Sequence, residues 1–153
     1  MQSAVSAQNV IVATMNSRAQ AEECLERLRQ AGSPIGQLSV VGRDAPSEEK
    51  AAAMFWAAVR ERLSAGAVLE VPRLGTMSVA GPIGQWMGAA LKNEAVFAGL
   101  SPLGAALYSL GIPKDAAERY EAAVECGQIL VIVHGAASQV EKARPILAAF
   151  TSL

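Results

Sequence analysis

The sequence predicts an α+β fold: a ferredoxin-like βαβ…αβ sandwich into which a β-hairpin and short helices are inserted. Two observations support this fold class. Strand patterns and helical patterns follow one another near both ends of the chain, over residues 9–42 and 113–150. Between them, residues 64–113 form a Gly/Ala-rich insert with two long uncharged segments, 74–91 and 95–113. A doubly covered α/β sheet is the alternative architecture.

Length and composition indicate one globular domain. At 153 residues, 52% of them hydrophobic, the chain can bury a sizeable core, so we assign residues 1–153 to a single domain. A net charge of −1 provides no basic surface for nucleic acid or an anionic membrane. No signal peptide is evident at the N-terminus, and two cysteines are too few for a disulfide framework. We therefore expect a cytoplasmic protein without a nucleic-acid partner.

The chain begins with a βαβ unit. Residues 9–14 are a β-branched run that is too short for a buried helix. Ser17, with Gln20 three residues later, forms a capping box that begins a helix, and Gly32 ends this helix. Residues 37–42 form the second strand. The two strands are expected to be parallel, with a right-handed crossover between them.

A second helix and a hairpin follow this unit. Ser47 caps the helix, which ends at Gly66. One side of this helix is apolar, but Trp56 lies off that stripe, which indicates a second contact surface. Residues 67–71 and 76–80 are predicted to be the two strands of the hairpin.

Two short helices are predicted after the hairpin. Pro82 is a suitable first residue for a helix over 83–91. Ser101 and Pro102 begin another over 103–110. The same residues interrupt the uncharged segments, each of which is about the ~20 residues that a bilayer requires. We therefore expect no membrane insertion, and membrane association is the less favoured alternative.

The C-terminal part contains the strongest strand signal of the chain. Pro113 begins a helix that Gly127 ends, and the strand QILVIV follows at residues 128–133. Ser138 and Glu141 form a capping box for the last helix.

Both alternating faces of the QILVIV strand are apolar. Ile129, Val131 and Val133 lie on one face, and Leu130 and Ile132 lie on the other. A sheet with one face in water would show polar residues on that face. Both faces must therefore be covered, one by the flanking helices and the other by the central insert or by a second subunit.

The sequence also carries a specific cluster after the insert: Gly111-Ile112-Pro113, followed by Ala117, Tyr120 and Glu121. Together with VPRLGTMSVAGPIGQWMGAAL in the insert, this cluster resembles the bacterial general stress protein family, small proteins induced by heat, cold or osmotic stress. The resemblance covers residues 9–150. Arg73 departs from it, since relatives more usually have Gly there. The resemblance implies no catalytic residues and no defined activity.

The titratable and thiol side chains do not form a recognisable catalytic or metal-binding pattern. His134 is the single histidine and has no Cys, Asp or Glu nearby at ligand spacing. Cys24 and Cys126 lie on separate helices without a CxxC motif, and we expect them to be uncoupled. We predict no catalytic residue, no metal and no cofactor.

The glycines of the insert are predicted to serve close packing. Gly81, Gly84 and Gly88 do not have the spacing of a dinucleotide-binding loop, and no Lys-Ser/Thr pair follows them. We expect Glu70 and Arg73 to lie in a solvent-exposed turn of the hairpin. In the alternative interpretation, the two side chains form a pair that faces a ligand.

The function predicted from these observations is non-enzymatic: a stress-related protein that acts by self-association or partner binding, as a two-fold dimer. The candidate interface residues are Trp56, Gly84, Trp86, Met87 and Gly88. In a competing account, the inserted helices cover the sheet within one chain and bury the same residues. The alternative function is a small-molecule-binding or enzymatic domain that uses a groove near the Glu70/Arg73 hairpin, although the sequence identifies no small molecule.

Overall fold

The computed structural model describes residues 5–7, 9–33, 35–43, 50–63, 66–71, 74–92 and 100–150. The strands are β1 (Val5–Ala7), β2 (Val10–Met15), β3 (Leu38–Arg43), β4 (Gly66–Val71), β5 (Gly75–Ala80) and β6 (Ile129–His134). The helices are α1 (Arg18–Gln30), α2 (Lys50–Leu63), α3 (Ile83–Lys92), α4 (Pro102–Leu110), α5 (Lys114–Glu125) and α6 (Ala137–Phe150). A 3-10 turn over Ile35–Gln37 precedes β3.

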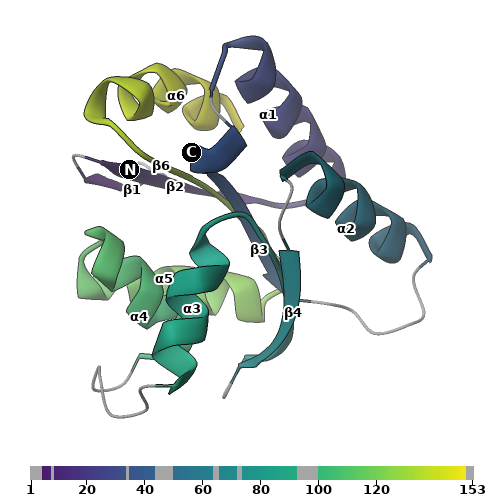
Figure 1. The fold of residues 1–153 in the computed structure, drawn as a ribbon, viewed down its shortest axis with the longest axis vertical. Helices are drawn as coiled ribbons and strands as arrows, with labels where there is room; N and C mark the ends of the chain where they lie inside the picture. Colours follow the sequence, from purple (N-terminus) through teal and green to yellow (C-terminus); the bar gives the residue numbers. More distant parts are fainter. Residues whose placement is uncertain are drawn as a thin grey trace.

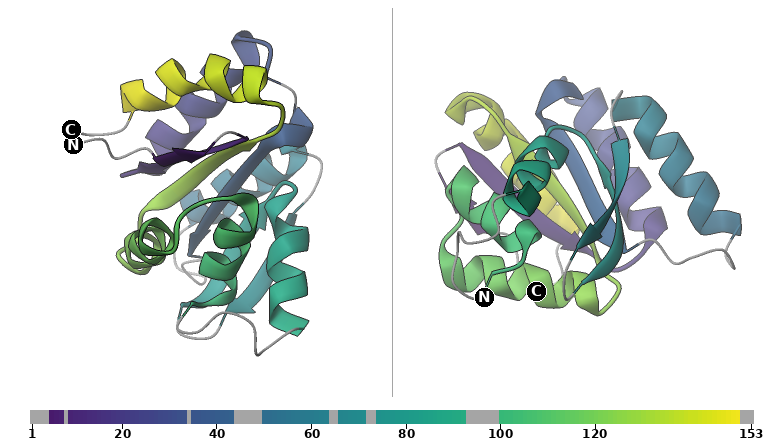
Figure 2. Two further views of the ribbon diagram at one scale, coloured as in Figure 1. Left: turned by 90° about the vertical axis from the view of Figure 1, so that its left-hand side faces the viewer. Right: turned by 60° about the horizontal axis from the view of Figure 1, so that its bottom comes forward.

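These elements form three layers with one sheet in the middle (Figure 1). Helices α1, α2 and α6 lie on one face, and α3, α4 and α5 lie on the other, as the side view in Figure 2 also shows. The six strands of the described residues run in the order β1-β2-β6-β3-β5-β4, and every neighbouring pair is antiparallel. The α+β class is therefore confirmed.

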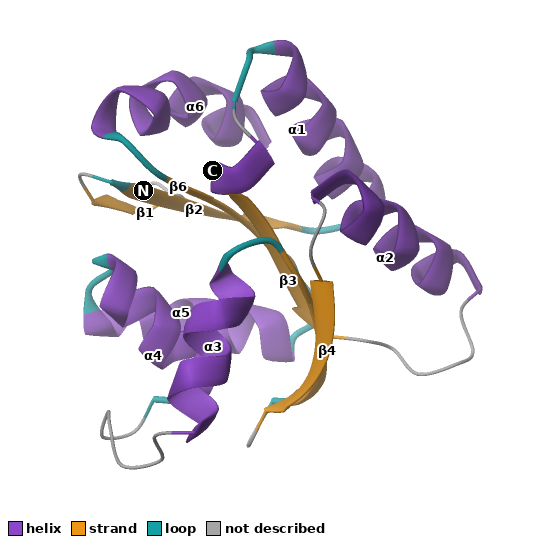
Figure 3. Ribbon diagram, viewed as in Figure 1, coloured by secondary structure: helices purple, strands orange, loops and turns teal. Residues whose placement is uncertain are grey.

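The N-terminal βαβ unit is split by the last strand. Strands β2 and β3 both pair with β6 in antiparallel register, so they are parallel to each other with β6 between them. The predicted parallel orientation of the two strands is confirmed, although they are not neighbours. A split βαβ unit occurs in ferredoxin-like folds. The complete ferredoxin-like topology is not confirmed, because the hairpin extends this same sheet and helices cover both of its faces (Figure 3).

The Gly/Ala-rich insert supplies both sheet and covering layer. Its two predicted strands are observed as β4 and β5, and β5 pairs with β3. The first uncharged segment, 74–91, is divided between β5 and α3. Part of the second, 95–113, lies outside the described residues, and the rest contains α4. Among the described residues, no helix is both long enough and apolar enough to cross a membrane.

The core consists of two apolar clusters, one on each face of the sheet. Strand β6 contributes to both: Ile129, Val131 and Val133 to one cluster, Leu130 and Ile132 to the other. On the first face they pack with side chains from α1, α2 and α6, including Cys24, Leu28, Phe55, Val59, Ala143 and Leu147. On the second face the partners come from α3, α4 and α5, including Ile83, Met87, Leu103, Leu107, Tyr120 and Val124. Both faces are thus covered within one chain.

Ser17 caps α1 as predicted, although the Gln20 side chain reaches the N–H of Asn16 and not the N–H of Ser17 that a standard capping box uses. The Ser17 hydroxyl accepts a hydrogen bond from the backbone N–H of Gln20 at 3.1 Å. The side chain of Gln20 accepts one in turn from the backbone N–H of Asn16 at 2.8 Å. Two donors at the helix N-terminus are satisfied in this way, which fixes where α1 begins. The predicted cap Ser47 of α2 lies outside the described residues.

A buried carboxylate joins α5 to the start of α4. Glu121 accepts hydrogen bonds from the backbone N–H of Ser101 at 2.6 Å and from the Ser101 hydroxyl. Ser101 also caps α4, since its hydroxyl oxygen accepts from the Gly104 N–H. A negative charge is favourable at this position because the N-terminus of a helix carries a partial positive charge.

The family-like cluster at residues 111–121 therefore has a structural role. Gly111 ends α4 with a φ of 116°, a left-handed conformation that suits glycine. The Tyr120 hydroxyl donates a hydrogen bond to the backbone oxygen of Val12 on β2 at 3.0 Å. Tyr120 therefore attaches α5 to the sheet, and Glu121 and Gly111 fix α4 relative to α5.

Substituting Ser101 tests this attachment. Ser101→Ala removes the helix cap and one of the hydrogen bonds to a buried carboxylate, and we expect it to lower the free energy of unfolding by about 2 kcal/mol. Ser109→Ala is the matched control, because Ser109 lies on the same helix and is exposed. Urea denaturation of both variants measures the difference. Equal stability of the two variants would show that the contact with Glu121 contributes nothing.

Candidate functional site

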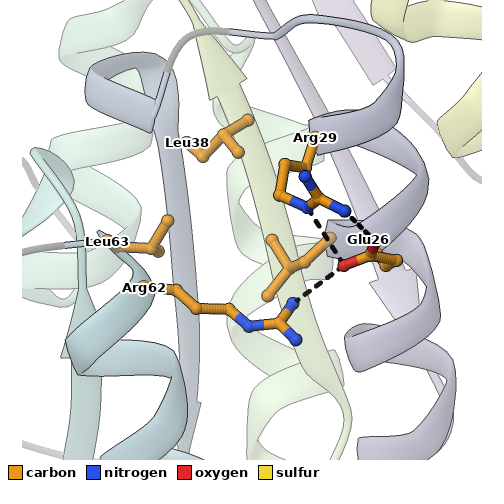
Figure 4. Close-up of a pocket in the computed structure, with 6 residues that line it drawn as sticks. Glu26, Arg29, Leu38, Arg62 and Leu63 are labelled. Carbon is orange, nitrogen blue, oxygen red and sulfur yellow. Dashed lines mark hydrogen bonds and ion pairs between the residues drawn. The ribbon is translucent and has the colours of Figure 1, made fainter.

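A pocket of about 270 Å³ lies between α1, α2 and the start of β3 (Figure 4). It is lined by Leu25, Glu26, Arg29, Leu38, Arg62 and Leu63. The three leucines come from three different elements, and each is buried. The three charged side chains lie at the rim, where both guanidinium groups point toward the carboxylate of Glu26 (Figure 4). The pocket thus has an apolar floor and a charged rim.

The rim is organised by Glu26. Arg29 donates two hydrogen bonds to this carboxylate, one from Nε at 3.2 Å and a shorter one from Nη2. Arg62 Nη1 lies 3.7 Å from Glu26 Oε1, the oxygen that accepts from Arg29 Nε, and this distance is beyond hydrogen-bond range. Hydrogen bonding from Arg29 and the charges of both arginines lower the pKa of Glu26, and its hydrogen bond to Glu26 raises the pKa of Arg29. Two guanidinium groups and one carboxylate give the rim a formal charge of +1.

This arrangement is suited to binding more than to proton transfer. A general base that works near neutral pH needs a pKa close to that pH, and the pKa of Glu26 is shifted the opposite way. Guanidinium groups remain protonated in proteins. The described residues contain no group of three or more His, Cys, Asp or Glu side chains placed to hold a metal ion.

The sequence did not identify this pocket. Glu26 and Arg29 lie three residues apart on α1, a spacing at which side chains of a helix meet. That spacing alone predicts an ordinary surface ion pair. Arg62 joins them only because α2 packs beside α1, and nothing in the local sequence around Arg62 signals this contact.

The candidate interface residues fall into three groups. Trp56 is 3% exposed and Met87 is fully buried, so neither side chain is available to a partner. Gly84 and Gly88 are partly exposed on α3, and no heavy atom of the described residues lies within 4 Å of a Cβ built at Gly88. The side chain of Trp86 lies outside the described part of the structure.

The position of Trp56 off the apolar stripe of its helix has an intramolecular cause. Its ring packs edge-to-face on Phe55 with centroids 5.0 Å apart. It also covers the backbone of Gly42 on β3, where a Cβ would lie only 2.7 Å from the indole ring. The second contact surface that the sequence indicated for Trp56 is therefore strand β3 of the same chain.

Of the two hairpin residues predicted as a possible ligand-facing pair, the structure describes Glu70. Glu70 is exposed and accepts a hydrogen bond from the Thr76 hydroxyl at 2.5 Å, directly across the β4–β5 ladder. Arg73 lies outside the described residues. The pocket lies elsewhere, and its lining includes neither Glu70 nor His134.

Gly81 is a packing glycine at the turn between β5 and α3. Its φ is 96°, and a Cβ there would lie 2.1 Å from the backbone oxygen of Leu38. The Ser39 hydroxyl accepts the backbone N–H of Ile83 at 3.1 Å, so a donor at the start of α3 is already satisfied. These contacts agree with close packing and leave no room for a phosphate at Gly81.

The remaining chemically reactive side chains are separated in the fold. His134 is partly buried at the end of β6, and this burial lowers its pKa. Cys24 is buried, and its desolvation raises the pKa of the thiol to about 12, although Arg27 acts weakly in the opposite direction. Cys126 is exposed at the end of α5. Both cysteines are free thiols.

Strand β4 forms one edge of the described sheet and β1 forms the other. Of these two edge strands, β4 is the longer. Strand β4 pairs with β5 at six positions and is the outermost strand of the described sheet on that side. Val68, near its middle, is 50% exposed. Helix α3 contacts β4. At the opposite edge, β1 has only three residues.

Comparison with known protein families, with curated proteins and with solved structures finds no match to this chain.

The two thiols are expected to react very differently. At pH 8, iodoacetamide should modify Cys126 and leave Cys24 unmodified, because only the thiolate reacts and Cys24 is both buried and protonated. Intact-mass spectrometry should show one adduct on the folded protein and two in denaturant. Two adducts on the folded protein would contradict the burial of Cys24.

Proposed function

We propose that this protein is a non-enzymatic, stress-related protein of the bacterial cytoplasm that acts by self-association, with the edge strand β4 at the contact. The resemblance of residues 9–150 to the bacterial general stress protein family supports the physiological setting. Free thiols at both cysteines fit a reducing compartment. The observation that carries the proposal is an edge strand of six residues with an exposed valine at its centre.

An edge strand exposes a row of backbone donors and acceptors that another strand can satisfy. Natural proteins commonly protect such edges by making them very short or by covering them. Within the described residues, β1 covers three residues, whereas β4 is as long as the internal strands. Two copies of β4 placed antiparallel would extend the sheet across a two-fold axis, the commonest symmetry for a homodimer.

The surface beside β4 is compatible with a second copy. Helix α3 lies next to β4, and its Gly88 leaves open space in which a neighbouring backbone could approach. Gly84 contributes less, since a Cβ there would already meet Val79 at 3.5 Å. The proposed contact therefore lies in the middle of the chain, as the sequence predicted, but centres on β4 instead of on Trp56 and Met87.

A charge at the centre of the edge tests the proposal. We expect the wild-type protein to have twice the chain mass of 15.9 kDa in multi-angle light scattering. Val68→Lys should give folded monomers, because two lysines would face each other across the two-fold contact. Ala148→Lys is the matched control: Ala148 is exposed on α6, which packs on β2 and β6 toward the other end of the sheet. A monomeric wild-type protein, or dissociation by both variants alike, would contradict the proposal.

The contribution of α3 can be tested separately. Gly88→Leu should raise the free energy of unfolding by up to about 1 kcal/mol, because Gly88 is inside helix α3 and no heavy atom of the described residues lies within 4 Å of an added Cβ. If α3 takes part in the contact, the same substitution should weaken dimerisation in sedimentation experiments at dilute protein concentration. An unchanged dimer affinity would restrict the contact to β4.

A further inference from the structure

We propose, on the basis of the self-association proposed above, that Glu70 determines the register in which two copies of β4 pair. The charge on Glu70 selects the register in which the two-fold axis passes through Val68. Each Val68 then faces its own copy, and each Glu70 lies opposite Gly66 of the partner subunit. Glu70 is thus a specificity-determining residue of the contact.

Two copies of one strand can pair antiparallel in only a few registers. Residues that lie opposite each other in a sheet point to the same face, so the two-fold axis must pass through a single residue, which then faces its own copy. Every other residue faces one that lies equally far from the axis in the opposite direction. In β4, an axis through Val68 or Leu69 pairs most of the strand, whereas an axis nearer to either end leaves much of it unpaired.

The charge on Glu70 distinguishes these two registers. Its side chain is exposed, and the Thr76 hydroxyl donates a hydrogen bond to its carboxylate, which holds the charge over the hairpin. An axis through Leu69 would place the two copies of Glu70 diagonally across the contact, about 8 Å apart on one face. An axis through Val68 separates them by about 14 Å, which exceeds the Debye length of about 8 Å at physiological ionic strength. Repulsion between the carboxylates therefore favours the axis through Val68.

The side chains that become neighbours also favour this register. Val68 is 50% exposed in one chain, and an axis through it brings two β-branched side chains together on one face, a pairing that stabilises antiparallel strands. Glu70 would lie opposite a glycine, which has no side chain to obstruct the carboxylate. With an axis through Leu69, each Val68 would instead face a carboxylate of the other copy.

Helix α3 fits a two-fold contact at β4. It contacts both β4 and β5, so it lies over the space between these two strands. Because neighbouring strands are about 4.8 Å apart, two copies of α3 would lie about 10 Å from each other on one face of the extended sheet. Helices pack at about 8–10 Å, and the open space at Gly88 permits such an approach. A strand pair about 20 Å long buries much less than the roughly 1,200–2,000 Å² of a stable interface, so the helix pair supplies area that the strands lack.

Cysteine cross-linking of the full chain locates the axis. In a Cys126→Ser background, which removes the exposed native thiol, Val68→Cys should form a disulfide-linked dimer under mild oxidation, because directly opposite Cβ atoms lie about 4.5–5.5 Å apart. Leu69→Cys is the matched control and should cross-link poorly, since its two copies would lie about 8 Å apart. Efficient cross-linking at Leu69→Cys, equal yields at both positions, or none at either in a dimeric protein would overturn the register and leave self-association intact. A monomeric wild-type protein in light scattering would overturn both proposals.

Removing the charge tests whether Glu70 enforces the register. Glu70→Gln, added to each cysteine variant, should lower the ratio of the Val68→Cys yield to the Leu69→Cys yield by roughly threefold, because the repulsion that excludes the second register is lost. High salt should lower the same ratio while Glu70 is present and leave it unchanged in Glu70→Gln. Glu61→Gln is the matched control, since Glu61 is an exposed carboxylate on α2, and it should not change the ratio. An unchanged ratio in Glu70→Gln, or an equal change in Glu61→Gln, would overturn the role of Glu70.

Discussion

Burial of strand β6 on both faces is the constraint on which the rest of the structure depends. Both of its alternating side-chain rows are apolar, and each row belongs to a different core cluster. Exposing either row to water would cost roughly 25 cal/mol for each Å² of apolar surface. The strand therefore needs a layer of helices on each side, and it needs a neighbouring strand on each edge. Strands β2 and β3 take those two positions, which places the last strand of the sequence between the first two long ones.

The second helical layer requires a specific attachment, because its helices are short and come from a glycine- and alanine-rich segment. Three contacts provide it: Tyr120 reaches the backbone of β2, Glu121 binds the start of α4, and Gly111 allows the tight turn between α4 and α5. A carboxylate in the core is costly unless its oxygens accept hydrogen bonds. The cap of α4 supplies those donors, so the same contact satisfies Glu121 and fixes the position of the helix. A Cβ at Gly104 would lie 2.3 Å from the Glu121 carboxylate, which leaves little freedom at that helix start.

The same arrangement determines where a partner or a ligand could bind. Because the two helical layers fill the space over the sheet, the candidate surfaces lie at its periphery. One is the free edge of β4, where the ladder ends. The other is the junction of α1, α2 and β3, where the leucines that close the core meet a charged rim.

The sequence by itself determined most of the local structure. Hydrophobic periodicity, the capping residues Ser17 and Ser101, and the glycines that end helices located α1, the β4–β5 hairpin, α4 and β6, because these signals act between residues close in the chain. The apolar character of both faces of β6 also required two covering layers. The sequence could not show that a single chain supplies both covering layers. Tertiary structure alone decided three features: the packing of Trp56 on Gly42, the order of the strands, and the proximity of Arg62 to Glu26. Each joins residues that are distant in sequence, and their contact depends on how whole elements pack.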